Sequence, residues 1–168
     1  RNTMEKVQTE TITEKISSGV KTAITELEEL RVQLALGKLE AKDLYDSNKK
    51  KFQAVIHDLE NQISNLKKEP GVSAILSGME HLKKQLALGT AESKDLFEEQ
   101  YTKISTALHE LETDLKNSKT LSENYAKIHL ELAKFKIKME LFALHYKLKK
   151  ISIEYDFDKI KSQLQSKL

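Results

Sequence analysis

The sequence contains no cysteine and no tryptophan, a single proline and only five glycines among its 168 residues. The absence of cysteine excludes a disulfide framework, a thiolate nucleophile and a cysteine-based zinc site. Aromatic residues make up only 6% of the chain, whereas charged residues make up 32%. This profile is typical of long amphipathic helices and argues against a β-rich or compact α/β enzyme. We therefore predict an all-α protein.

The charge of the chain is nearly balanced, and long apolar runs are lacking. The chain contains 28 lysines and arginines and 26 aspartates and glutamates, which gives a net charge of +2. Nucleic-acid binding usually shows a dense basic patch, so no nucleic-acid partner is expected. No apolar run approaches the roughly 20 residues that cross a bilayer, and residues 1–10 lack the pattern of a signal peptide. These features favour a soluble protein in the cytoplasm, although the lack of cysteine leaves the compartment open.

One segment of the chain occurs twice. QLALGKLEAKDLYD at 33–46 recurs as QLALGTAESKDLFE at 85–98, displaced by 52 positions, and the correspondence extends back to Gly19 and Gly71. We interpret this as a tandem duplication of one helical unit. In both copies apolar residues recur in steps of three and four, which is the period of a helix, with an interruption near Asn48 in the first copy.

The expected helices follow from the breaks between these patterns. Pro70-Gly71 is the clearest break, and the predicted helices cover about 19–68, 72–116 and 121–168. Each would be roughly 70 Å long, and the short connections make consecutive helices antiparallel. We therefore predict an elongated antiparallel three-helix coiled-coil bundle, built on the 52-residue helical repeat, as a single domain over residues 19–168. Residues 1–18 would form an N-terminal arm or a short helix.

Gly37 and Gly89 occupy the same position in the two copies, on the apolar stripe. Glycine inside a helix costs about 0.5–1 kcal/mol relative to alanine, so its presence in both copies needs a reason. We interpret both as sites of close packing between neighbouring helices. The alternative is that each glycine ends one helix before the next begins, which would double the number of helices.

The predicted helix 121–168 carries two apolar stripes on nearly opposite sides, whereas an ordinary surface helix buries only one. Either the helix lies between other helices, so that both stripes are internal, or one stripe is buried by a second subunit or another partner. We favour self-association, because a row of apolar side chains this long is larger than the patches that monomers usually expose. The predicted interaction face consists of Leu130, Ile137, Leu141, Leu144, Leu148, Ile151 and Tyr155.

Histidines provide the main candidates for chemistry. The segments HDLE at 57–60 and HELE at 109–112 place a histidine and a carboxylate on one helical face, in the reverse of the Glu-x-x-His order found in di-iron bundles. The two motifs would lie roughly 40 Å apart, so they cannot form one site. The possible metal-binding pairs are His57 with His81 and His109 with His129. Solvated histidines are the better interpretation, and we expect no metal, cofactor or catalytic residue.

The phrases LALGKLEAKDLYDSNKKKF and LALGTAESKDLFEEQYTKI resemble segments of bacterial coiled-coil proteins of uncharacterised or stress-associated role. The resemblance covers about residues 19–115 and rests on amphipathic helices rich in Glu, Ala and Lys. It implies a helical coiled-coil fold and no catalytic or ligand-binding residue, and the tryptophans common in those proteins are missing here.

The sequence thus predicts a non-enzymatic coiled-coil scaffold or protein-interaction module that self-associates through helix 121–168. Its partner would be a second copy of the chain or another helical protein. An alternative is peripheral binding to a membrane surface by the same amphipathic helix, assisted by its lysines. A metal-binding helical bundle is the third hypothesis.

Overall fold

The fold is all-α, as predicted. A computed structural model describes the backbone of residues 2–37, 40–117 and 122–146, with side chains from 18–37, 40–117 and 126–146. These residues form helices α1 (Asn2–Leu36), α2 (Ala41–Ile63), α3 (Val72–Leu86), α4 (Lys94–Asn117) and α5 (Ser122–His145). A short 3-10 turn, Ser64–Leu66, extends α2. No strand occurs within these ranges.

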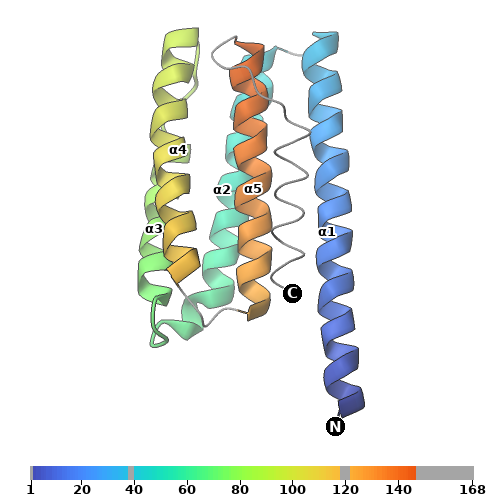
Figure 1. Cartoon of the computed structure of the whole chain (residues 1–168). Coiled ribbons are helices and arrows are strands. Elements are labelled where there is room, and N and C mark those ends of the chain that lie inside the picture. The colour runs from blue at the N-terminus through green and yellow to red at the C-terminus, as the bar shows by residue number, and fades with distance from the viewer. Residues whose placement is uncertain (1, 38–39, 118–121, 147–168) are drawn as a thin grey trace.

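Consecutive helices run in alternating directions along one common axis (Figure 1). Helices α2, α3, α4 and α5 pack in a ring, each against the next, and α5 closes the ring against α2. Helix α1 stands outside this ring and packs mainly on α5, to which it runs parallel. The first turns of α1 extend past the other helices (Figure 1). The described part of the chain is therefore a four-helix bundle with a fifth helix on one side.

The prediction of three long continuous helices is wrong. The expected helix 19–68 begins upstream, at Asn2, and breaks between Leu36 and Ala41, while the expected helix 72–116 breaks between Leu86 and Lys94. Residues 1–18 are likewise not a separate arm, because α1 continues from Asn2 without interruption. Helix α5 is described only to His145, so the rest of the predicted helix 121–168 lies outside the described residues.

Gly37 and Gly89 end helices and do not mediate close packing, which corrects our interpretation. Their φ angles are +65° and +56°, a left-handed conformation that glycine adopts without steric cost. A Cβ atom at either position would meet nothing within 4 Å. The amide of Gly37 donates to the carbonyl oxygen of Gln33 at 3.3 Å and closes the last turn of α1. The alternative of a helix end at each glycine is therefore the one the structure adopts.

Close packing between helices occurs instead at two other glycines. A Cβ on Gly19 of α1 would lie 2.9 Å from a methyl group of Leu130 on α5. A Cβ on Gly78 of α3 would lie 3.1 Å from the side chain of Leu111 on α4. These glycines allow α1 to approach α5, and α3 to approach α4, more closely than a larger residue would permit.

The core lies along the axis of the ring and is made of aliphatic and aromatic side chains. Tyr45 packs edge-on against Phe97 and Phe142, with ring centroids 5.0 and 5.4 Å apart. Phe52 of α2 stacks on Phe135 of α5 at 4.0 Å. Because α5 contacts α1, α2 and α4, it is buried on more than one side. The position of α5 explains its two apolar stripes.

Candidate functional site: a buried lysine cluster and an interhelical cavity

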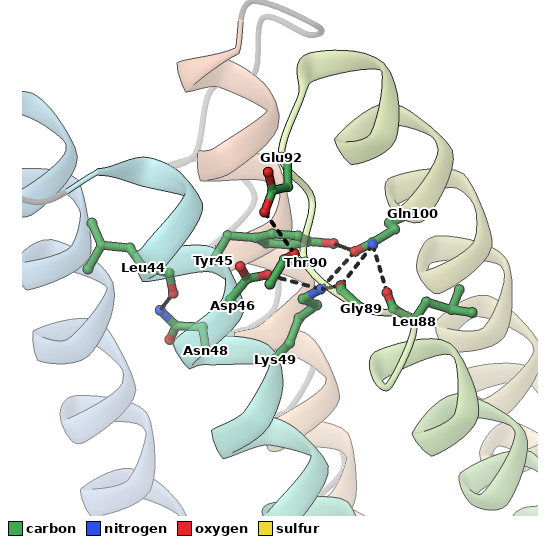
Figure 2. Close-up of polar contacts among 10 residues, drawn as sticks. All are labelled: Leu44, Tyr45, Asp46, Asn48, Lys49, Leu88, Gly89, Thr90, Glu92 and Gln100. Carbon is green, nitrogen blue, oxygen red and sulfur yellow. Dashed lines mark hydrogen bonds and ion pairs between the residues drawn. The ribbon is translucent and has the colours of Figure 1, made fainter.

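Lys49 is a buried cation on α2, only 3% exposed, and its ammonium group contacts three oxygen atoms (Figure 2). It donates to the carbonyl oxygen of Gly89 at 2.7 Å and to Oε1 of Gln100 at 2.8 Å. Oδ1 of Asp46, one turn earlier on the same helix, lies 3.2 Å away. The ammonium also lies 4.5 Å from the ring centroid of Tyr45, close enough for a cation–π contact.

Gln100 of α4 completes this cluster and binds the loop between α3 and α4. Its amide nitrogen donates to the carbonyl oxygens of Leu88 and Gly89 at 3.0 and 3.1 Å. Its amide oxygen accepts hydrogen bonds from Lys49 and from the hydroxyl of Tyr45. Side chains of α2 and α4 thus bind carbonyl groups of the loop that follows α3, which have no partners within a helix. We call Tyr45, Asp46, Lys49 and Gln100 the Lys49 cluster.

The Lys49 cluster is built to hold a loop rather than to perform a reaction. Burial lowers the pKa of Lys49, and the hydrogen bond and charge of Asp46 oppose that shift. The ammonium donates two hydrogen bonds and forms an ion pair with Asp46, so its three close polar contacts all lie within the fold. Burial also raises the pKa of Tyr45, which keeps its hydroxyl protonated as a donor. The arrangement stabilises the α3–α4 connection.

A second polar cluster joins α1 to α5 and α2. Oε2 of Glu26 lies 3.2 Å from Nζ of Lys134 and 3.3 Å from Nζ of Lys138. Lys134 also contacts Glu131 at 3.2 Å, and Lys138 donates to Oδ1 of Asn48 at 3.1 Å. Two ammonium groups therefore share one carboxylate oxygen. Burial lowers the pKa of Lys138, while Glu26 acts in the opposite direction.

A cavity of about 230 Å³ lies beside this second cluster. Three helices line its wall. The lining residues are Glu26 of α1, then Asn48, Lys51, Phe52 and Val55 of α2, and Glu131, Lys134, Phe135 and Lys138 of α5. We call it the α1–α2–α5 cavity. It lies beside the contact of α1 with α5. It combines aromatic surface with several charged groups, and it is the strongest candidate for a ligand site among the described residues.

The described members of the predicted interaction face on α5 are mostly internal, which differs from the expectation that this stripe is exposed. Ile137 and Leu141 are buried at 3% and 4% exposure, and Leu130 is half-buried against Gly19 of α1. Leu144 is the one exposed member among these four described residues, at 38%. The physical reason is that α1 covers this side of α5. The predicted face also includes Leu148, Ile151 and Tyr155, which lie outside the described residues.

The structure places the four histidines of the predicted pairs on four different helices. His57, His81 and His109 are exposed, on α2, α3 and α4, whereas His129 of α5 is buried. Within the described ranges, no three histidine, aspartate or glutamate side chains are grouped so that they would hold a metal ion. Over the same ranges no helix is long and apolar enough to cross a membrane.

Sequence reasoning missed Lys49, although the sequence contained a signal for it. The buried stripe of α2 is Tyr45, Lys49, Phe52, Ile56, Leu59 and Ile63, in steps of four and three. We noted an interruption near Asn48 but did not place a lysine in the core. A charged residue in the register of a buried stripe indicates a buried ion pair or hydrogen-bond cluster.

Searches against protein-family models, curated proteins and solved structures give no match to this chain. The fold defines the class of the protein as an all-α helical bundle. A fold alone does not indicate a function, which depends on particular residues.

Proposed function

We propose that this protein is a non-enzymatic helical scaffold that binds a protein partner through one end of the bundle. The observation that supports this proposal is the position of the large exposed apolar side chains. Among the described side chains these are Val32, Leu36, Leu88, Leu96 and Leu144. They lie in the last turns of α1 and α5, the first turn of α4 and the loop after α3. Because the helices alternate in direction, all of these positions fall at the same end (Figure 1).

Val32 and Leu36 form the most exposed part of this set, at 55% and 60%. They are one turn apart on α1, so they share one face of the helix. Exposed apolar groups that gather in one region, with charged residues elsewhere, are typical of protein-binding surfaces. We name the five residues the apolar end. A second copy of the chain is the partner we propose, in a dimer that buries the apolar end rather than the side of α5.

The coiled-coil scaffold suggested by the sequence is retained in this proposal, with a changed contact surface. The membrane-surface alternative relied on the apolar stripe of α5, and that stripe is buried at Ile137 and Leu141. The absence of a catalytic site remains part of the proposal, and the burial of Lys49 among contacts within the fold supports it.

The test is the mass of the protein in solution as a function of concentration, measured by light scattering after size-exclusion chromatography. The expected result is a dimer that the double variant V32S/L36S converts to a monomer. The matched control is Q33S/A35S, which changes two exposed positions on the same turns of α1. A monomer at all concentrations, or a dimer that both double variants leave intact, would contradict the proposal. Equal melting temperatures of the variants would show that folding is unaffected.

A further inference from the structure

The α1–α2–α5 cavity is open because of a difference between the two copies of the sequence repeat. Gly78 of α3 corresponds to Glu26 of α1, 52 positions earlier. Gly78 brings α3 against Leu111 of α4, with no room for a larger side chain. The counterpart of Leu111 is Leu59 on α2, but Glu26 extends instead to Lys134 and Lys138 on α5. Helix α1 therefore packs on α5, and residues of α1, α2 and α5 line the cavity together.

The charges around this cavity are unequal. Among the described residues that line it, Lys51, Lys134 and Lys138 are accompanied by two carboxylates, those of Glu26 and Glu131. Lys134 and Lys138 share one oxygen of Glu26, and Lys134 also contacts Glu131, so Lys138 has no second carboxylate among the ion pairs of the described residues. Lys51 is exposed and has no ion-pair or hydrogen-bond partner among the described residues. The cavity thus has one positive charge in excess, which an anion would compensate.

Apart from Asn48, the remaining wall is apolar. Phe52 and Phe135 stack at 4.0 Å with their planes 7° apart, and their edges line the cavity together with Val55. Apolar surface of this kind favours a ligand with a hydrocarbon or aromatic part. The volume of about 230 Å³ lies below the range of about 300–1,000 Å³ that is usual for drug-sized ligands. The ligand is therefore small.

From these observations we infer that the α1–α2–α5 cavity binds a small amphipathic anion, a carboxylate that carries a short apolar tail. The tail contacts the phenyl rings of Phe52 and Phe135, and the carboxylate is held by the ammonium of Lys51 at the mouth. Lys138 adds positive potential from within the wall. This ligand site is separate from the apolar end, so the inference does not depend on the proposed function.

Nuclear magnetic resonance titration of the full chain with hexanoate tests this inference. We expect saturable shifts of backbone amide signals in residues 48–55 and 131–138, with a dissociation constant in the range of about 0.1–10 mM. Acetate keeps the charge without the tail, and hexanol keeps the tail without the charge. Both are expected to bind at least about tenfold more weakly, because each lacks one of the two contacts.

Two substitutions connect the binding to the cavity. Lys51→Gln removes the uncompensated cation and is expected to weaken hexanoate binding about fivefold, whereas Lys50→Gln changes an exposed neighbour outside the cavity and serves as the control. Val55→Phe fills the cavity and is expected to abolish binding while the melting temperature stays within a few degrees. Lys51 is exposed, so its replacement leaves the fold intact. The Lys51→Gln variant therefore still tests the inference if Val55→Phe destabilises the protein.

Three results would overturn the inference. They are the absence of saturable shifts with hexanoate, equal affinity for hexanoate and hexanol, and hexanoate binding that Lys51→Gln and Lys50→Gln change to the same extent. If the protein is a dimer that does not bind hexanoate, the proposed function is supported and the cavity site is not. If it is a monomer that binds hexanoate, the cavity site is supported and the proposed function is not. The two proposals therefore fail independently.

Discussion

Lys49 and Gly89 are 40 residues apart in the chain, and the ammonium of Lys49 donates to the carbonyl oxygen of Gly89 at 2.7 Å. This hydrogen bond joins α2 to the loop that follows α3, and so connects the two segments that the sequence predicts to be copies of one unit. Residue 101, the position that corresponds to Lys49 in the second copy, is a tyrosine, whose hydroxyl donates to Glu140 instead. The same position therefore makes different contacts in the two segments. Lys49 binds a loop carbonyl, whereas Tyr101 binds a side chain of α5.

Replacing Lys49 with methionine is expected to destabilise the fold by about 2–4 kcal/mol. The substitution preserves the apolar stem but leaves the Asp46 carboxylate and the Gly89 carbonyl without their buried cation. The free energy of unfolding, measured by urea denaturation, gives the value. Lys50→Met, at an exposed neighbouring position, is the control and should change the free energy by less than about 0.5 kcal/mol. Equal effects of the two substitutions would show that the buried contacts of Lys49 contribute little.

Replacing Gly89 with alanine should cost about 1 kcal/mol, because a left-handed backbone is unfavourable for a residue with a Cβ atom. Steric conflict is not the cause, since nothing lies within 4 Å of the added carbon. Gly89→Asn is the matched comparison, because asparagine tolerates this conformation better than alanine. Thermal unfolding should therefore rank the wild type first, asparagine second and alanine last. A larger loss for asparagine would contradict the backbone explanation.

Truncating Ile137 to alanine tests whether the second apolar stripe of α5 is internal. At 3% exposure, this side chain should contribute about 2–4 kcal/mol to the free energy of unfolding. The same truncation at exposed Leu144 should cost less than about 1 kcal/mol. If Ile137→Ala left stability unchanged but dissociated an oligomer, the original expectation of an exposed interaction face would be restored.

Acid should weaken the attachment of α1 through Glu26. Burial alone would raise the pKa of this carboxyl, but the charges and hydrogen bonds of Lys134 and Lys138 outweigh it and hold the pKa below its ordinary value of 4.5. The resulting stabilisation is fully present above pH 4.5 and is lost as the pH falls through the lowered pKa of the folded state. Glu26→Gln should therefore be less stable than the wild type at pH 7, with a difference that shrinks toward pH 3. Denaturation curves between these pH values provide the measurement, and a constant difference would exclude the ion pairs as its cause.

Alkaline conditions should act through Tyr101. Burial raises its pKa above the ordinary value of 10.0, and the hydrogen bond to Glu140 at 2.6 Å acts in the same direction. The stabilisation is complete below pH 10 and is lost as the pH rises toward the raised pKa, because the unfolded chain releases the proton first. Tyr101→Phe should show a smaller decline in the free energy of unfolding above pH 10 than the wild type. Lys49 and Lys138 are present in both proteins, so the difference between the two curves isolates the tyrosine, and parallel curves would contradict the prediction.

The candidate site was only partly visible in the sequence. The three-and-four spacing indicated helices, and a lysine in the register of Tyr45 and Phe52 was a signal that could have identified the buried cluster. Its partner Gly89 could not be identified in this way. The contact is made by a backbone carbonyl, which every residue has, so the residue type does not indicate it. The contact of Glu26 with Lys138 across 112 positions was equally inaccessible. Such pairs depend on which helices become neighbours.

The sequence by itself determined that the chain is helical, where its apolar faces lie and that the two copies share a common pattern, because these properties follow from local periodicity and composition. Tertiary structure alone decided that Gly37 and Gly89 end helices, that α5 is covered by α1, and that residues of α1, α2 and α5 line a cavity together. A local pattern specifies which face of a helix avoids water, but several neighbours can cover that face equally well. The choice among them is made by the shapes and charges of side chains distant in the chain, such as Gly19 against Leu130 and Glu26 between two lysines.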